Sequence, residues 1–123
     1  MPGAMADQNN MQIVSSAAIR SGARILQLKG PLNIHTVFQF QDAVRSDTSP
    51  LVIVDFTGVP YADSAGLGAM VGAFVSAQRA QRRLAFAGMN EQVKALVEMT
   101  HVSQLFRPFA TVEEADRAIA PSA

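Results

Sequence analysis

The sequence contains no cysteine and no tryptophan, and neither sign of charge is in excess. Without cysteine there is no disulfide, no thiolate metal ligand and no cysteine nucleophile, and its absence fits a reducing, cytoplasmic setting. Ten Lys plus Arg balance ten Asp plus Glu, which argues against a nucleic-acid binder, because such proteins normally carry a basic excess. No apolar run approaches the ~20 residues of a membrane-spanning helix, so we expect no direct insertion into a membrane.

The chain is rich in apolar side chains. They make up 49% of its 123 residues, enough for one hydrophobic core but not for two independent ones. Residues 1–10 are small and polar, and we expect them to form a flexible N-terminal tail. We expect residues 11–120 to form a single folded domain.

The hydrophobic pattern alternates between strand and helix periods after a leading hairpin. Strands are expected at residues 11–20, 23–29, 51–56 and 83–88, with a short extended segment at 102–108. Helices are expected from Asn33 or Thr36 to about Arg45, and over residues 64–79, 91–99 and 112–119. This order predicts an α/β fold: a mixed β-sheet of four to five strands, parallel at its centre, with about four flanking helices.

The most informative segment joins the apolar strand 51–56 to the helix that begins near Ser64. Functional sites in open α/β sheets lie at the carboxyl ends of parallel strands, where this turn presents a hydroxyl group. Asp63 is well placed to cap the helix, because its carboxylate can accept hydrogen bonds from the amides of the first turn. Asp55, at the end of the strand, is expected to orient the loop that follows.

Small residues recur every four positions along this helix, at Ser64, Gly68, Gly72 and Ser76. Glycine inside a helix costs roughly 0.8–1 kcal/mol relative to alanine, so close approach of another backbone is the simplest compensation at Gly66 and Gly68. The stripe of small side chains allows either another protein or a neighbouring element of the same domain to pack closely.

Three chemistries can be considered for the turn. In the first, Ser64 is a nucleophile, His101 is its base, and Glu91 or Glu98 orients the histidine. Against it, the sequence contains no oxyanion-hole segment, and the chain is too short for a hydrolase fold. A phosphate-binding loop misses the required glycine spacing by one residue, and Asp63 would repel the phosphate. In the third, Ser64 is a covalent switch, where a phosphate adds about −1.5 to −2 charges.

Residues 51–59, together with the segment Tyr61-Ala-Asp-Ser-Ala-Gly-Leu-Gly68, resemble the central signature of STAS domains, specifically the bacterial anti-sigma factor antagonists. The resemblance extends from about Met11 to Ile119 and implies a small domain with a mixed β-sheet flanked by helices. It also implies that Ser64 is phosphorylated by an anti-sigma factor that is a serine kinase, and that a serine phosphatase reverses the modification. The unphosphorylated domain would bind the kinase and release a sigma factor, acting as a ligand and not as an enzyme.

The resemblance places a partner-binding surface around Ser64 and predicts no cofactor and no metal site. Its expected residues are Asn33, Thr36, Asp63, Ala65, Gly66, Leu67, Gly68 and Gly72. One departure is Asn33, where the switching members of the family commonly carry aspartate. This departure favours an alternative function, an unphosphorylated STAS adaptor or scaffold in a stress-signalling or membrane-transport complex.

Overall fold

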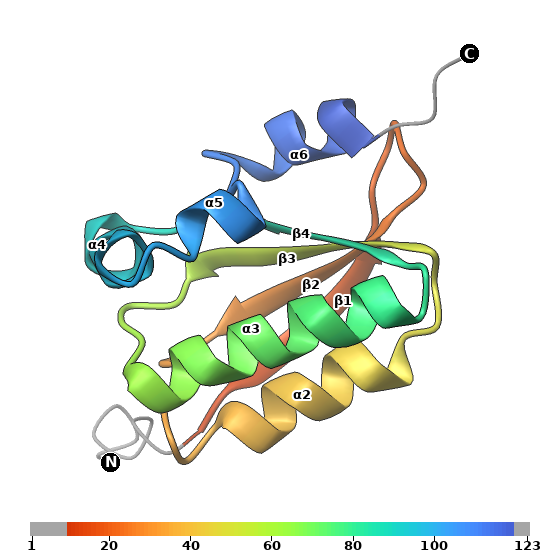
Figure 1. Cartoon of the computed structure of the whole chain (residues 1–123). Helices are drawn as coiled ribbons and strands as arrows, with labels where there is room; N and C mark the ends of the chain where they lie inside the picture. Colours follow the sequence, from red (N-terminus) through yellow and green to blue (C-terminus); the bar gives the residue numbers. More distant parts are fainter. Residues whose placement is uncertain (1–9, 120–123) are drawn as a thin grey trace.

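Four strands form one mixed sheet in the order β1-β2-β3-β4 in the computed structural model, which describes residues 10–119 (Figure 1). The strands are β1 (Gln12–Ala17), β2 (Arg24–Lys29), β3 (Leu51–Gly58) and β4 (Arg83–Ala87). The helices are α2 (Val37–Ser46), α3 (Ser64–Arg79), α4 (Glu91–Met99), α5 (Ser103–Phe106) and α6 (Val112–Ile119). β1 and β2 are antiparallel, and β2, β3 and β4 are parallel, which confirms the predicted leading hairpin and mixed sheet. The predicted tail lies almost wholly outside the described residues.

The central strand β3 is covered on both faces, as its unbroken apolar sequence predicts. Side chains alternate between the two faces of a strand, and β3 accordingly contributes to two separate cores. Val52, Val54 and Phe56 face the larger core, and Ile53 faces the smaller one.

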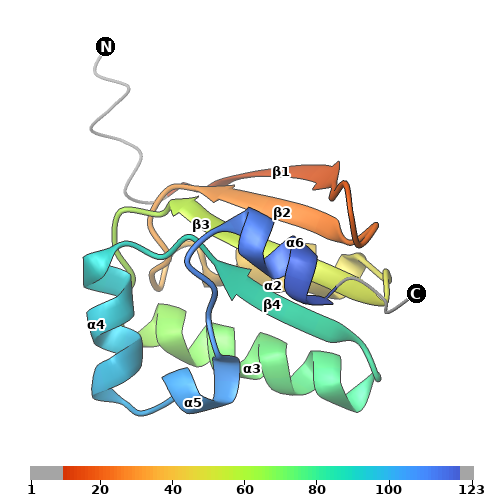
Figure 2. The same ribbon diagram turned by 90° about the horizontal axis from the view of Figure 1, so that it is seen from above.

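Helices α2 and α3 cover one face of the sheet, whereas α6 lies on the other (Figures 1 and 2). The larger core lies beneath α2, α3 and α4 and includes Phe40, Met70 and Val93, each fully buried. The smaller core lies beneath α6, where Ala115 and Ile119 pack on alanines of β4. Within residues 10–119 no helix has the length and apolar character needed to cross a membrane.

The extended segment predicted at residues 102–108 is wrong. Residues 103–106 form the short helix α5, which ends at Arg107 in a left-handed conformation with φ 48°. The cause is Phe106, whose ring lies 4.7 Å from that of Phe86 and 5.5 Å from that of Phe74. A helical turn brings this ring into the core, and the gain from burying it outweighs the weak local preference of the segment.

A buried carboxylate fastens the tip of the β1–β2 hairpin to α6. The carboxylate oxygens of Asp116 accept hydrogen bonds from the backbone N–H groups of Arg20 and Ser21, at 3.0 and 2.7 Å. Burial alone would raise the pKa of Asp116, but hydrogen bonds from the side chain of Ser21 and from these two amides, with the charge of Arg20, lower it below its ordinary value. The first strand is therefore tied to the last helix.

Candidate functional site

Ser64 is the first residue of α3 and its side chain is exposed to solvent. Asp63 occupies the N-cap position, and its Oδ1 accepts a hydrogen bond from the N–H of Gly66 at 2.9 Å, which confirms the predicted cap. Its second oxygen, Oδ2, accepts from the N–H of Ile34 at 3.3 Å. One carboxylate thus holds both the start of α3 and the loop that precedes α2.

That loop runs beside the turn carrying Ser64, and the two backbones are joined directly. The N–H of Leu32 donates to the carbonyl of Tyr61 at 3.1 Å, and the N–H of Asp63 donates to the carbonyl of Leu32 at 3.2 Å. The same Leu32 carbonyl lies against Gly66, in the space that a Cβ atom would occupy. The predicted close backbone approach is therefore confirmed at Gly66.

Two residues predicted to contact a partner, Asn33 and Thr36, lie inside this loop and not on its surface. Asn33 is 5% exposed and Thr36 is fully buried. The hydroxyl of Thr36 donates to the carbonyl of Pro31 at 2.7 Å and accepts from the N–H of Asn33 at 2.9 Å. Thr36 stands at the N-cap of α2, yet its side chain makes no capping hydrogen bond. Both side chains shape the loop from within.

The loop and the first turn of α2 expose two large apolar side chains beside the exposed polar residues His35 and Gln39, and sequence reasoning missed these two apolar residues. Ile34 is 64% exposed and Phe38 is 73% exposed. They are four residues apart, and Ile34 is bonded through its N–H to Asp63, the neighbour of Ser64. The signal that could have found them is their mismatch with the buried face of α2, to which Phe40 and Val44 belong.

The amide of Asn33 joins the loop to Tyr61 on the other side of the turn. Its Nδ2 donates to the hydroxyl of Tyr61 at 3.1 Å, and its Oδ1 accepts from the N–H of His35 at 2.9 Å. An aspartate at this position can accept both hydrogen bonds, because the tyrosine hydroxyl can turn and donate, but it would add a buried negative charge close to Asp63. Asn33 therefore preserves the loop geometry without that charge.

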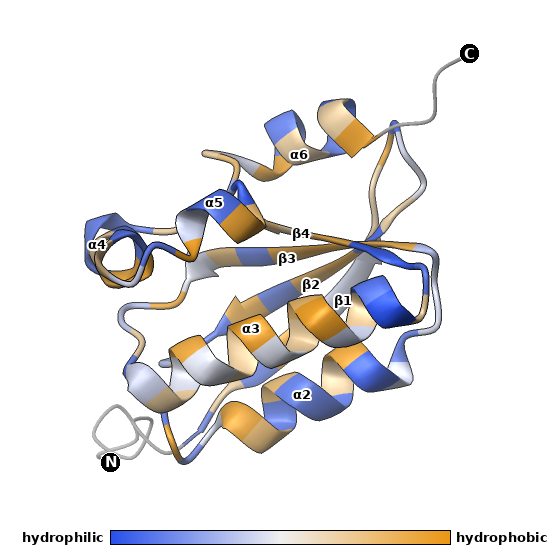
Figure 3. Cartoon of the chain, in the orientation of Figure 1, coloured by the Kyte–Doolittle hydropathy of each residue, from blue (hydrophilic) through white to orange (hydrophobic). Residues whose placement is uncertain are grey.

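Along α3, the small residues divide into a buried set and an open one. A Cβ atom built on Gly68 or Gly72 meets nothing within 4 Å, and Ser64 and Ser76 are exposed. The prediction that close backbone approach compensates for Gly68 is therefore wrong, and so is the alternative in which a neighbouring element packs directly on Gly68 and Gly72. Ala65 is partly buried, whereas Leu67 packs in the core. In Figure 3 most of α3 is coloured from white to orange, whereas α2 alternates between orange and blue.

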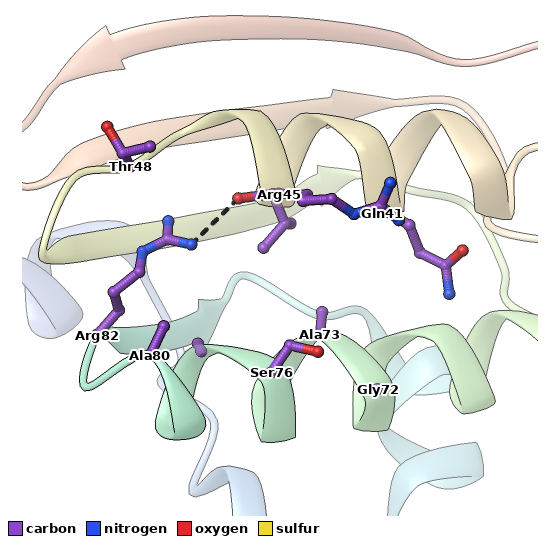
Figure 4. Close-up of a pocket in the computed structure, with 10 residues that line it drawn as sticks. Gln41, Arg45, Thr48, Gly72, Ala73, Ser76, Ala80 and Arg82 are labelled. Carbon is purple, nitrogen blue, oxygen red and sulfur yellow. Dashed lines mark hydrogen bonds between the residues drawn. The ribbon is translucent and has the colours of Figure 1, made fainter.

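A hollow of about 540 Å³ separates the carboxyl-terminal halves of α2 and α3 (Figure 4). It exists because α3 contributes only small side chains here, among them Gly72 and Ser76. Arg82 spans one end, where its guanidinium donates to the carbonyl of Ser49 at 2.9 Å and to that of Val44 at 3.4 Å. The open stripe that starts at Ser64 thus continues into a groove.

The first turn of α4 fixes the loop that leads from β3 to Ser64. Asn90 caps α4 by accepting from the N–H of Val93 at 2.9 Å, and its Nδ2 donates to the carbonyls of Val59 and Pro60, at 3.3 and 3.0 Å. Gln92 accepts from the N–H of Ala62 at 3.2 Å. Ser64 is therefore held in position by contacts from α4 as well as from the loop before α2.

The serine-nucleophile chemistry weighed for the turn finds no support in its geometry. No hydrogen bond joins Ser64 to a histidine in the described part of the chain, and His101 is an exposed residue just after α4. No group of three His, Cys, Asp or Glu side chains is arranged to hold a metal ion among residues 10–119. Asp55 has the predicted local role, because its Oδ1 accepts from both the N–H and the hydroxyl of Thr57, at 2.9 and 2.6 Å.

Together these features define a class of protein: a small α/β domain with an N-capped, serine-bearing helix start and exposed apolar residues in the segment that is hydrogen-bonded to it. A family model for the STAS domain matches residues 15–115. The chain belongs to the STAS domain family.

Known relatives agree with this assignment. The anti-sigma-B factor antagonist of Listeria monocytogenes is 40% identical over 52 residues, a match that spans 42% of this chain and 46% of that protein. A crystal structure of an anti-sigma factor antagonist from Mycobacterium paratuberculosis has the same fold, with a TM-score of 0.80 at 14% identity, over 90% of this chain and 95% of the other. The Bacillus cell fate determinant SpoIIAA, in a structure described as its phosphorylated form, matches with a TM-score of 0.65 at 20% identity, over 87% of this chain and 99% of SpoIIAA.

Proposed function

We propose that this protein is an anti-sigma factor antagonist, a binding module controlled by phosphorylation of Ser64. The observation that carries the proposal is the exposed Ser64 hydroxyl at the start of α3, with open small residues further along the helix and the exposed Ile34 in the loop that is hydrogen-bonded to Asp63. The relatives named as anti-sigma factor antagonists support it. In this proposal the protein is a substrate and a ligand, not an enzyme, and it works in the cytoplasm.

The docking surface is a shallow apolar area around Ser64, which consists of Ile34, Phe38, Ser64, Gly68 and Gly72. The two glycines let a partner approach the α3 backbone closely, and the two large side chains provide anchors for it. Burying an exposed isoleucine or phenylalanine contributes about 1.5–3 kcal/mol each, so these two residues account for a substantial share of the affinity. The side chains of Asn33, Thr36 and Asp63 hold the backbone of this surface in place through their hydrogen bonds.

A phosphate on Ser64 would change this surface without unfolding the helix. The first turn of α3 presents amide groups to an anion, which stabilises a negative charge there. The Asp63 carboxylate next to it is already bonded to the N–H groups of Gly66 and Ile34. About two negative charges and their hydration then stand where an apolar partner must dock, and desolvating them costs more than the apolar contacts return.

The partner is an anti-sigma factor that is also a serine kinase. It transfers the γ-phosphoryl group of ATP to Oγ of Ser64: the bond from the β–γ bridging oxygen to the γ-phosphorus breaks, an O–P bond to Oγ forms, and the hydroxyl proton and ADP are released. A serine phosphatase hydrolyses the ester with water, which restores the hydroxyl and releases inorganic phosphate. The unphosphorylated form sequesters the kinase and so releases a sigma factor.

Incubation of the purified protein with its cognate kinase and ATP tests the proposal. We expect one phosphate, located at Ser64 by peptide mass spectrometry, and none in a Ser64→Ala variant. Ser76 provides a matched control, because it is an exposed serine on the same helix, and Ser76→Ala should be phosphorylated at the normal rate. Modification at another residue, or none with any candidate kinase, would refute phosphorylation control.

Asn33 favours a second candidate, an unphosphorylated STAS adaptor or scaffold. Its uncharged amide already satisfies Tyr61 and His35, so the loop is complete without the aspartate found in switching members. In that case a Ser64→Ala variant signals like the natural protein in the cell, whereas the phosphorylation proposal requires Ser64→Ala to be locked in the binding state.

A further inference from the structure

The two ends of the molecule carry opposite charges, although the chain as a whole is neutral. The parallel strands begin at one end, where α2, α3 and α6 finish and the β1–β2 hairpin turns, and they finish at the other end, where Ser64 lies (Figures 1 and 2). Seven of the ten basic residues belong to the first of these ends, which we call the basic end: Arg20, Arg24, Arg45, Arg79, Arg82, Arg83 and Arg117.

The acidic residues near the basic end do not neutralise it. Asp116 is buried and bonded to backbone amides of the hairpin. Asp42 pairs with Arg45 at 3.3 Å, and Asp47 accepts from the N–H of Ser49 at 2.9 Å. Three acidic residues against seven arginines leave this end strongly positive, whereas the described part of the opposite end carries most of the remaining carboxylates.

Helix capping accounts for only part of this clustering. The carboxyl-terminal ends of helices attract cations, which explains Arg45, Arg79 and Arg117 in the last turns of their helices. Arg82 is held by carbonyl groups of the chain near the end of α2. Capping does not explain Arg20 in the hairpin turn, or Arg24 and Arg83 at the first positions of β2 and β4. The basic end therefore contains more arginines than helix stability requires.

An exposed isoleucine stands at the tip of the hairpin within this positive region. Ile19 is 97% exposed, next to Arg20, whose backbone N–H is fixed by Asp116. The turn is further closed by the N–H of Ala18, which donates to the carbonyl of Ala23 at 2.7 Å. A hydrogen-bonded tip that presents an apolar side chain among arginines suits a surface with anionic head groups and an apolar layer just below them. A nucleic acid also offers phosphates, but an isoleucine reaches its bases only by entering a groove or wedging between base pairs, whereas a membrane interface accepts the side chain directly.

We propose that the basic end docks on anionic membrane lipids, with Ile19 reaching the boundary between head groups and acyl chains. The attachment is peripheral and depends on ionic strength, because it rests on charge and one apolar side chain. Ser64 then faces away from the membrane, so the docking surface around it stays open to its partner. This inference does not depend on the proposed function, since it involves none of the residues of that docking surface.

Sedimentation of the full chain with vesicles tests the proposal. We expect the protein to bind vesicles that contain phosphatidylglycerol and not to bind vesicles of pure phosphatidylcholine. Bound protein should be released in about 1 M salt, where the Debye screening length is only about 3 Å. The double variant Arg79→Gln/Arg83→Gln should bind roughly 25-fold more weakly, the equivalent of about 1 kcal/mol for each basic residue at an anionic surface. Neither side chain makes a hydrogen bond or an ion pair in the described structure, and a melting curve checks that the fold is intact.

The matched control removes two charges from the opposite half of the molecule. Lys29→Gln/Lys94→Gln has the same net charge as the arginine variant but should bind these vesicles within about twofold of the natural protein. Ile19→Ser should weaken vesicle binding several-fold without changing the melting temperature, because Ile19 makes almost no contact with the fold.

Three results would overturn membrane docking: no sedimentation with phosphatidylglycerol vesicles at low salt, an equal loss in both double variants, or displacement from the vesicles by an equal concentration of duplex DNA phosphates. The last would identify the basic end as a nucleic-acid surface. Kinase assays on Ser64 remain informative in each case, so the two proposals fail separately.

Discussion

The backbone carbonyl of Leu32 lies against Gly66, in the space that a side chain at position 66 would fill. This contact joins the loop before α2 to the first turn of α3, and with the Asp63 carboxylate it sets the position of Ser64. Glycine at position 66 is therefore a packing requirement, whereas the other two glycines of α3 have open space around them.

The three glycines of α3 should respond in opposite ways to the same substitution. Gly66→Ala must push the Leu32 backbone aside, and we expect it to lower the free energy of unfolding by about 1–3 kcal/mol. Gly68→Ala and Gly72→Ala add a methyl group in open space inside a helix, and each should raise it by up to about 1 kcal/mol. Urea denaturation of the three variants measures this; equal effects at all three positions would contradict the Leu32–Gly66 contact.

Asp63 should contribute to stability through its cap. Asp63→Ala removes the acceptor for the N–H of Gly66 and should cost about 1 kcal/mol, within the usual range of 0.5–2 kcal/mol for such caps. Asp63→Asn keeps an acceptor oxygen and serves as the control, with most of the stability retained. Chemical denaturation compares the two. Comparable losses in both variants would show that charge, and not the hydrogen bond, is what matters at this position.

Asp116 should make the protein sensitive to acid. Its pKa is lower in the folded state than in the unfolded chain, so its stabilising effect is complete above the unfolded value of about 3.9 and is lost as the pH falls through the lower, folded value. The free energy of unfolding should therefore fall below about pH 4 in the natural protein, and less steeply in Asp116→Asn. Glu113→Gln, an exposed position on the same helix, is the control. Parallel pH profiles for the natural protein and Asp116→Asn would contradict this prediction.

Phe38 should matter for binding and not for folding. Its ring is 73% exposed, so Phe38→Ser should leave the melting temperature unchanged, while the complex with the anti-sigma factor weakens at least tenfold. Met99, which is 74% exposed at the end of α4, is the matched control, and Met99→Ser should leave that complex intact. Isothermal calorimetry separates the two effects. If Phe38→Ser and Met99→Ser bind equally well, the docking surface does not include α2.

Local patterns predicted those parts of the protein in which a residue's role depends on its neighbours in the chain. The unbroken apolar run of β3, the helical period of α3 and the Asp63 cap are of this kind, because strand burial, helix periodicity and capping act over a few residues. The turn carrying Ser64, which suggested the family, is equally local. These features determined the α/β class and the position of the candidate site.

Only the tertiary structure decided what depends on elements distant in sequence. The rings of Phe74 and Phe86 draw Phe106 into a helical turn where the sequence suggested an extended segment. The loop before α2 turns Asn33 and Thr36 inward and leaves Ile34 and Phe38 exposed, because its polar groups bond to Tyr61 and to Pro31. Composition shows a balanced charge, and only the parallel arrangement of the strands gathers seven arginines from segments far apart in the sequence at one end of the molecule. The burial of a side chain, the direction in which it points and the distribution of charge over the surface are properties of the folded chain, because each depends on which segments pack against one another.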